Sequence, residues 1–89
     1  MPNEIGFSLC KLPSGKLTHG PIATGTPISV GIPVQCPSGS ALYGLFHTHP
    51  GGVPYPSQRD VKSQRLTGAK VSCIQSDKAL KCFRLKGAR

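Results

Sequence analysis

Residues 41–60, ALYGLFHTHPGGVPYPSQRD, hold the signals that decide the fold. The first nine residues, 41–49, form the most apolar run in the chain, with two aromatic residues and no formal charge. Such a run is typical of a central, buried strand. The prolines and glycines over 50–56 then exclude regular structure. The stretch therefore predicts a buried strand that ends in a loop.

A helix is predicted directly after this loop. Ser57 has the features of a helix N-cap, and Asp60 follows at the position that completes a capping box. We expect the helix to run from Gln58 to about Leu66 and to end near Gly68.

The flanking sequence predicts further strands on both sides. Residues 4–9 alternate between polar and apolar with period two, which indicates a strand. A turn over 12–16 is expected to close a hairpin onto residues 17–24. Prolines at 21, 27 and 33 exclude a central strand over 21–34, which we place as an edge strand or extended loop.

A last hairpin is predicted from 71–75 and 80–85, with its turn at 76–79. Residues 86–89 are expected to form a frayed tail. Strands in both halves with one helix between them predict an α+β fold: a mixed, mainly antiparallel sheet with one main helix after the 41–49 strand. The 89 residues suffice for a single minimal domain, 1–89, with its core at about 4–85.

The chain is basic because acids are scarce. Eleven Lys and Arg face only three acids, Glu4, Asp60 and Asp77, for a formal net charge of +8. Nucleic acid is a possible partner on this ground but a disfavoured one, since the basic residues are not unusually numerous. No apolar run approaches the 18 residues of a membrane span, and no signal peptide is visible, so a cytoplasmic location is expected.

The cysteines at 10, 36, 73 and 82 do not have the C-x₂-C or C-x₄-C spacing of a zinc knuckle. In an intracellular chain we expect them to be small, buried apolar side chains. Cys73 and Cys82 would face each other across the last hairpin. They could form a cross-strand disulfide in an oxidising compartment, and the sequence leaves that open.

The histidines of the 41–49 strand predict a metal site. His47 and His49 are two residues apart, so their imidazoles project to the same face of the strand. Neutral imidazole is a preferred zinc ligand, and the Asp60 carboxylate can supply a third ligand from the first turn of the helix. Three protein ligands leave the fourth position open for water, as in a catalytic Zn²⁺ site.

Hydrolysis also requires a proton-transfer group and an oxyanion donor. Glu4 is the only glutamate in the chain and is therefore the candidate general acid/base of that type. Ser57 lies one helical turn before Asp60, and its hydroxyl is the candidate oxyanion donor. Both have simpler alternative interpretations, Glu4 as an exposed strand end and Ser57 as a cap alone.

The pattern of these residues resembles that of the JAMM (MPN-plus) metalloprotease domains. Their signature is an upstream Glu, then H-x-H-P, then S-x-x-D, matched here by Glu4, His47, His49, Pro50, Ser57 and Asp60. The resemblance implies a cytidine-deaminase-like fold, one catalytic zinc ion and a peptidase or isopeptidase activity. The implied substrates are the C-terminal tails of ubiquitin-like or sulfur-carrier proteins.

The residues give less support to two other classes of protein. The loop HPGGVPYPS is also similar to that of RadC-type proteins, so a non-catalytic MPN-type or RadC-like module that binds protein or nucleic acid is the alternative. The complete set of Glu, two His, Ser and Asp favours the enzyme. A zinc nucleobase deaminase is disfavoured because H-x-E and P-C-x-x-C do not occur.

Overall fold

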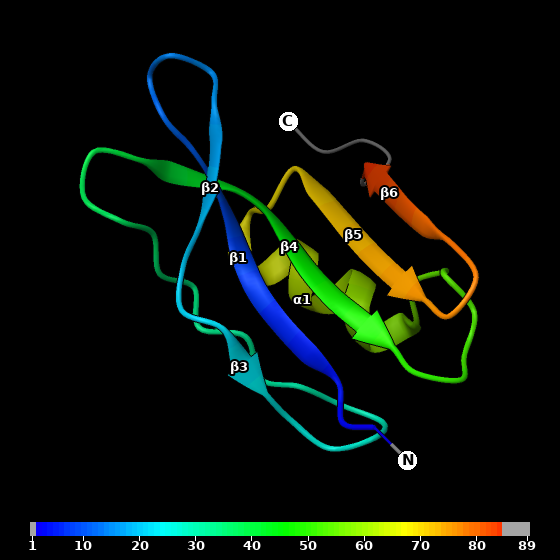
Figure 1. Cartoon of the computed structure of the whole chain (residues 1–89). Coiled ribbons are helices and arrows are strands. Elements are labelled where there is room, and N and C mark those ends of the chain that lie inside the picture. The colour runs from blue at the N-terminus through cyan, green and yellow to red at the C-terminus, as the bar shows by residue number, and fades with distance from the viewer. Residues whose placement is uncertain (1, 85–89) are drawn as a thin grey trace.

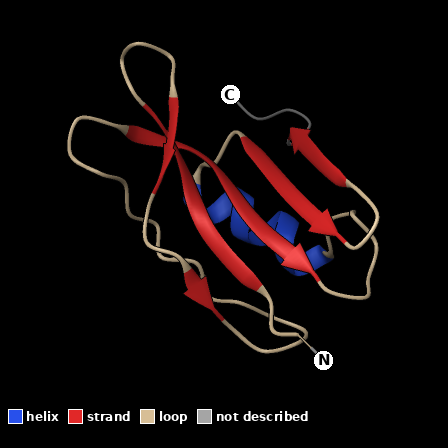
Figure 2. Cartoon of the chain, in the orientation of Figure 1, coloured by secondary structure: helices blue, strands red, loops and turns tan. Residues whose placement is uncertain are grey.

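The computed structural model describes residues 2–84, which form one mixed sheet with a helix on one face (Figures 1 and 2). The strand order is β2-β1-β4-β5-β6, and β3 pairs with the other end of β1. Residue 85 of the predicted last strand and the predicted tail, 86–89, lie outside the described residues. The elements are β1 (Ile5–Lys11), β2 (Leu17–His19), β3 (Ala23–Thr24), β4 (Ala41–His49), α1 (Gln58–Thr67), β5 (Val71–Ser76) and β6 (Leu80–Arg84).

Strand β4 lies at the centre, as its apolar sequence predicts. It pairs antiparallel with β1 and parallel with β5, while β5 and β6 form the predicted hairpin. The parallel pair requires a crossover, which α1 provides behind the sheet in Figure 1. The predicted α+β class with a mixed, mainly antiparallel sheet is confirmed.

Helix α1 has the predicted capping box. The Ser57 hydroxyl accepts a hydrogen bond from the Asp60 N–H, and the Asp60 carboxylate accepts one from the Ser57 N–H. The helix ends at Gly68, whose φ of 77° is the left-handed conformation that favours glycine at a C-cap. Within residues 2–84, no helix has the length and apolar character needed to cross a membrane.

The two faces of β1 differ from the usual pattern of a half-buried strand. The face that carries Gly6, Ser8 and Cys10 is buried, whereas the apolar face with Phe7 and Leu9 is only half-buried. The extended segment that follows β3 covers the buried face. The two are joined by a hydrogen bond from the Ser8 hydroxyl to the Pro33 carbonyl at 2.6 Å. Glu4 belongs to this polar face, so the strand directs it into the molecule.

The predicted strand over 17–24 is interrupted. β2 and β3 both pair with β1 but are separated by Gly20, Pro21 and Ile22. Pro21 has no N–H to donate to a ladder, and a Cβ at Gly20 would overlap the Gln35 carbonyl oxygen. Beyond β3 the chain is an extended loop, as its prolines predict, and it folds over the buried face of β1.

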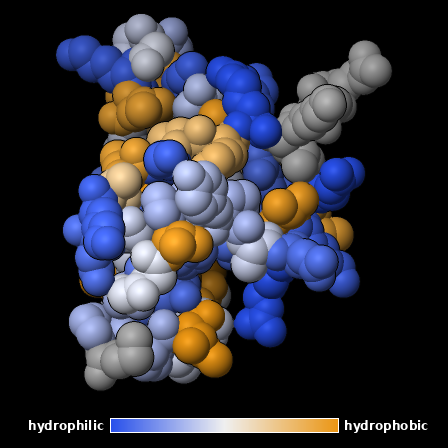
Figure 3. All heavy atoms as spheres, turned by 90° about the vertical axis from the view of Figure 1, so that its right-hand side faces the viewer, coloured by the Kyte–Doolittle hydropathy of each residue, from blue (hydrophilic) through white to orange (hydrophobic). Residues whose placement is uncertain are grey.

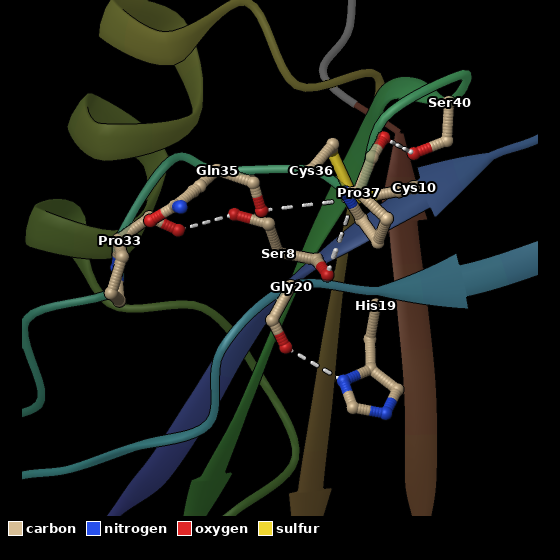
Figure 4. The surroundings of a disulfide bond; sticks show 9 residues. All are labelled: Ser8, Cys10, His19, Gly20, Pro33, Gln35, Cys36, Pro37 and Ser40. Atoms are coloured by element: carbon tan, nitrogen blue, oxygen red, sulfur yellow. Dashed lines mark hydrogen bonds between the residues drawn. A yellow bond between two sulfur atoms is a disulfide. The ribbon is translucent and has the colours of Figure 1, made fainter.

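The expectation that the cysteines are only small, buried apolar side chains is wrong, and the disulfide left open for Cys73 and Cys82 is present. Cys10 is bonded to Cys36 and Cys73 to Cys82, so all four are in disulfides. The turn at 76–79 places Cys73 directly opposite Cys82, as predicted. The first pair joins residues 26 apart through a loop that no local pattern defines (Figure 4). Disulfides are rare in cytosolic proteins, which weighs against the expected cytoplasmic location.

The Cys10–Cys36 disulfide is expected to contribute more to stability than Cys73–Cys82. It closes a loop of 26 residues rather than 9, and the chain-entropy estimate is about 3.5 kcal/mol against about 2.6 kcal/mol. The free energy of unfolding should therefore fall further in the Cys10→Ala/Cys36→Ala variant than in Cys73→Ala/Cys82→Ala. Urea unfolding of both variants measures the difference, and a larger loss in the second variant would contradict the ranking.

Candidate metal centre

The end of β4 brings the two predicted histidine ligands together. His47 and His49 project to the face of the sheet that α1 covers, and their Nε2 atoms lie 2.9 Å apart. His47 is only 5% exposed, so its imidazole lies in the interior. The two Nε2 atoms therefore point at one location in the interior.

Asp60 reaches the same location from the first turn of α1. Its Oδ2 atom lies 3.2 Å from Nε2 of His47 and 3.4 Å from Nε2 of His49. The same oxygen accepts the capping hydrogen bond from the Ser57 N–H, so the cap orients the carboxylate. Burial would raise the pKa of Asp60, but hydrogen bonds from His47 and Ser57 outweigh it and lower the pKa to about 2. Asp60 is thus an anion at neutral pH.

This arrangement fits a tetrahedral zinc ion. Ligands at 2.0–2.1 Å from zinc in tetrahedral geometry lie about 3.3 Å from one another. The three separations of 2.9, 3.2 and 3.4 Å among the two Nε2 atoms and Oδ2 are close to that value. Two imidazoles and one carboxylate are also the donor set that zinc accepts with an open fourth position.

Glu4 lies beside these ligands and is 6% exposed. In β1, Gly6 pairs with His47, and the same antiparallel register continued by two residues brings Glu4 opposite His49. The backbone of Glu4 is fixed by hydrogen bonds with Thr26 and Gly25. Its carboxylate, His47 and His49 form a cluster whose ligand atoms all lie within 4.8 Å of one another.

Two carboxylates are therefore candidates for the third ligand. Asp60 makes ion-pair contacts with both histidines, whereas Glu4, in the described residues 2–84, makes none. The contacts therefore favour Asp60 as the third ligand and leave Glu4 beside the donor atoms of the two histidines. Burial raises the pKa of Glu4 above its ordinary value, although the two histidines oppose the effect. A raised pKa suits a group that must accept and return a proton.

The structure places Ser57 at the rim of the same cavity. Its hydroxyl accepts the Asp60 N–H at 3.2 Å, so the predicted capping role is present. A hydroxyl that accepts through a lone pair keeps its own proton, and the predicted role as an oxyanion donor stays compatible with the cap.

The cavity, of about 880 Å³, extends from the metal ligands between α1 and the segment 28–34. Its walls include Ile28 and Ile32 on one side and Leu66 on the other. Sequence reasoning missed these residues. The sequence does hold a signal for this wall of the cavity. Apolar side chains stand between the prolines at 27 and 33, in a segment that is expected to form neither a buried strand nor a helix.

A second missed residue is Val53, in the loop that follows β4. Its carbonyl oxygen lies 2.9 Å from Nδ1 of His49. Because that carbonyl can only accept, His49 carries its proton on Nδ1 and presents the Nε2 lone pair to the metal location. A backbone contact of this kind has no sequence signature.

The fold is that of a JAB/MPN domain. The chain is similar to the crystal structure of a JAB1/MPN domain protein from Archaeoglobus fulgidus, with 23% identity and a TM-score of 0.65. That similarity covers 97% of this chain and 74% of the other. The sequence profile of the prokaryotic homologs of the JAB domain matches residues 34–86. No curated protein matches the sequence.

The match covers more than half of the chain, which therefore belongs to the family of prokaryotic JAB domains. The predicted membership of the JAMM/MPN group is thus confirmed.

Proposed function

We propose that the protein is a zinc-dependent peptidase or isopeptidase of the JAMM type. The observation that carries the proposal is the convergence of His47, His49 and Asp60 within 3.4 Å, with the buried Glu4 beside them. A structural zinc site is closed by a fourth protein ligand, whereas a catalytic site has three. The donor set that is present leaves a position for water.

Each residue then has a separate task. His47, His49 and Asp60 would hold the ion, which when bound supplies a Lewis acid and a water of lowered pKa. Glu4 would accept the proton of that water and return it to the leaving amine. Ser57 would donate to the oxygen that becomes negative on the attacked carbonyl. The low pKa of Asp60 keeps it anionic, so that it does not compete with Glu4 for the proton.

We propose the C-terminal tail of a ubiquitin-like or sulfur-carrier protein as the substrate. The cavity between α1 and segment 28–34 has a volume of about 880 Å³ and a partly apolar lining, which suits an extended tail. The basic chain would attract an acidic carrier surface. A cytoplasmic location stays a prediction.

A binding module is the alternative, and metal removal distinguishes the two. We expect the protein to cleave a ubiquitin-like fusion across its C-terminal Gly-Gly junction, to lose activity completely with a chelator, and to regain it when zinc is restored. Mass spectrometry of the products measures cleavage. A binding module would capture the fusion on a column but leave it intact, and zinc-loaded protein that cleaves no such fusion would contradict the proposal.

A further inference from the structure

The third acid of the chain lies outside the metal centre but contacts the loop that serves it. Asp77 stands in the turn between β5 and β6. Its Oδ2 atom accepts a hydrogen bond from the Gly51 N–H at 3.1 Å. Among residues 2–84, Asp77 forms no ion pair. The charge-assisted hydrogen bond to the Gly51 N–H is therefore the main contact of its carboxylate.

The contacted loop determines how His49 is oriented. It turns back on itself after β4, because the Gly52 N–H donates to the His49 carbonyl and Gly51 adopts a φ of 69°. That turn carries the Val53 carbonyl to Nδ1 of His49 at 2.9 Å. The position of one backbone carbonyl thus decides which nitrogen of His49 bears the proton.

In the described residues 2–84, the loop has one other set of contacts with the β5–β6 hairpin, made by Tyr55. Gly51, Gly52, Val53 and Tyr55 are exposed, so core packing does not fix it. Figure 3 shows the side of the molecule on which β6 lies, where the surface is mostly hydrophilic with small, separate apolar groups. The hydroxyl of Tyr55 lies 3.1 Å from Nζ of Lys81, and its ring packs against Phe83 with the ring centroids 5.9 Å apart. The contacts of Asp77 and Tyr55 both attach the loop to the β5–β6 hairpin.

We propose that Asp77 is a positioning residue for the metal ligand His49, acting through Gly51 and the Val53 carbonyl. This inference rests on the proposed zinc site. All three acids of the chain would then serve the metal centre. Asp60 is the proposed ligand, Glu4 lies beside the ligands, and Asp77 holds the loop that orients His49.

Zinc affinity is the first test. We expect Asp77→Ala to weaken zinc binding roughly tenfold, at the low end of the loss seen when an outer-shell partner is removed. Asp77→Asn should restore most of the affinity, because its amide oxygen can still accept from the Gly51 N–H. Lys78→Ala, in the same turn, is the matched control and should bind as the wild type does. Competition with a chromophoric chelator measures all four proteins.

The protonated nitrogen of His49 is the second readout, and it separates positioning from a general loss of stability. Long-range ¹H–¹⁵N NMR of the metal-free protein should show His49 protonated on Nδ1, where the Val53 carbonyl accepts. Asp77→Ala should shift His49 toward a mixture of both forms while His19 is unchanged. Wild-type zinc affinity and an unchanged His49 in Asp77→Ala would overturn the inference. A wild type that binds no zinc would instead overturn the proposed function.

Discussion

Replacing His47 by alanine is expected to lower the affinity for zinc by more than about a hundredfold. Loss of a partner behind a metal ligand already costs ten- to a hundredfold, and loss of the ligand itself should exceed that range. His47 is the most buried of the three proposed ligands and contacts both others, His49 at 2.9 Å and Asp60 at 3.2 Å. Two remaining ligands would leave the ion largely coordinated by water.

The measurement is the zinc content of purified protein by elemental mass spectrometry, followed by titration of metal-free samples. His19→Ala is the matched control. His19 is exposed on β2 and contacts Phe7 on the face of the sheet away from α1, so zinc loading should not change. Wild-type loading of the His47→Ala protein, or a wild type that cannot be loaded at all, would contradict the assignment of the metal centre.

The elements nearest the metal centre were predictable because each depends on contacts a few residues apart. The capping box of Ser57 and Asp60 is a local pattern, and Gly68 ends the helix for a local reason. The pairing of Cys73 with Cys82 follows from counting outward from a four-residue turn. The apolar run that became β4 matches its predicted bounds, 41–49, because proline and glycine follow it directly.

What the sequence did not predict depends on contacts between distant segments. Cys10 and Cys36 meet because segment 28–36 folds back over β1, and no period or motif in that segment indicates the direction of the fold. The same return places Ile28 and Ile32 along the cavity. The hydrogen bond from Ser8 to Pro33 helps to fix this segment, yet neither residue stands out in the sequence.

The candidate site lies between these two cases. His47, His49 and Asp60 were predicted from spacing, and the structure brings them together. Glu4 was chosen as the only glutamate and by resemblance. Its place beside the histidines is produced by the β1–β4 register, a pairing between segments about 40 residues apart. Sequence therefore supports the ligands more directly than it supports the acid/base.

Replacing Glu4 by glutamine is expected to lower kcat by about 10²- to 10⁴-fold, the range that general acid–base catalysis contributes. Glutamine has the same shape and can still hydrogen-bond to water, but it cannot take a proton. Zinc affinity should stay close to that of the wild type, because Asp60 rather than Glu4 is assigned as the third ligand. Turnover of a ubiquitin-like fusion and zinc titration on the same samples measure both quantities.

The Asp60→Asn variant shows which of the two carboxylates is the metal ligand and which is the acid/base. If Asp60 is the ligand, that variant should lose zinc affinity and activity together, whereas Glu4→Gln should lose activity alone. If Glu4 is the ligand instead, Glu4→Gln should lose zinc affinity and activity together, and Asp60→Asn should keep its zinc affinity. The cluster of Glu4 with both histidines is the reason to test this alternative. Normal cleavage by Glu4→Gln would show that another group moves the proton, and the single buried glutamate would then have a structural role only.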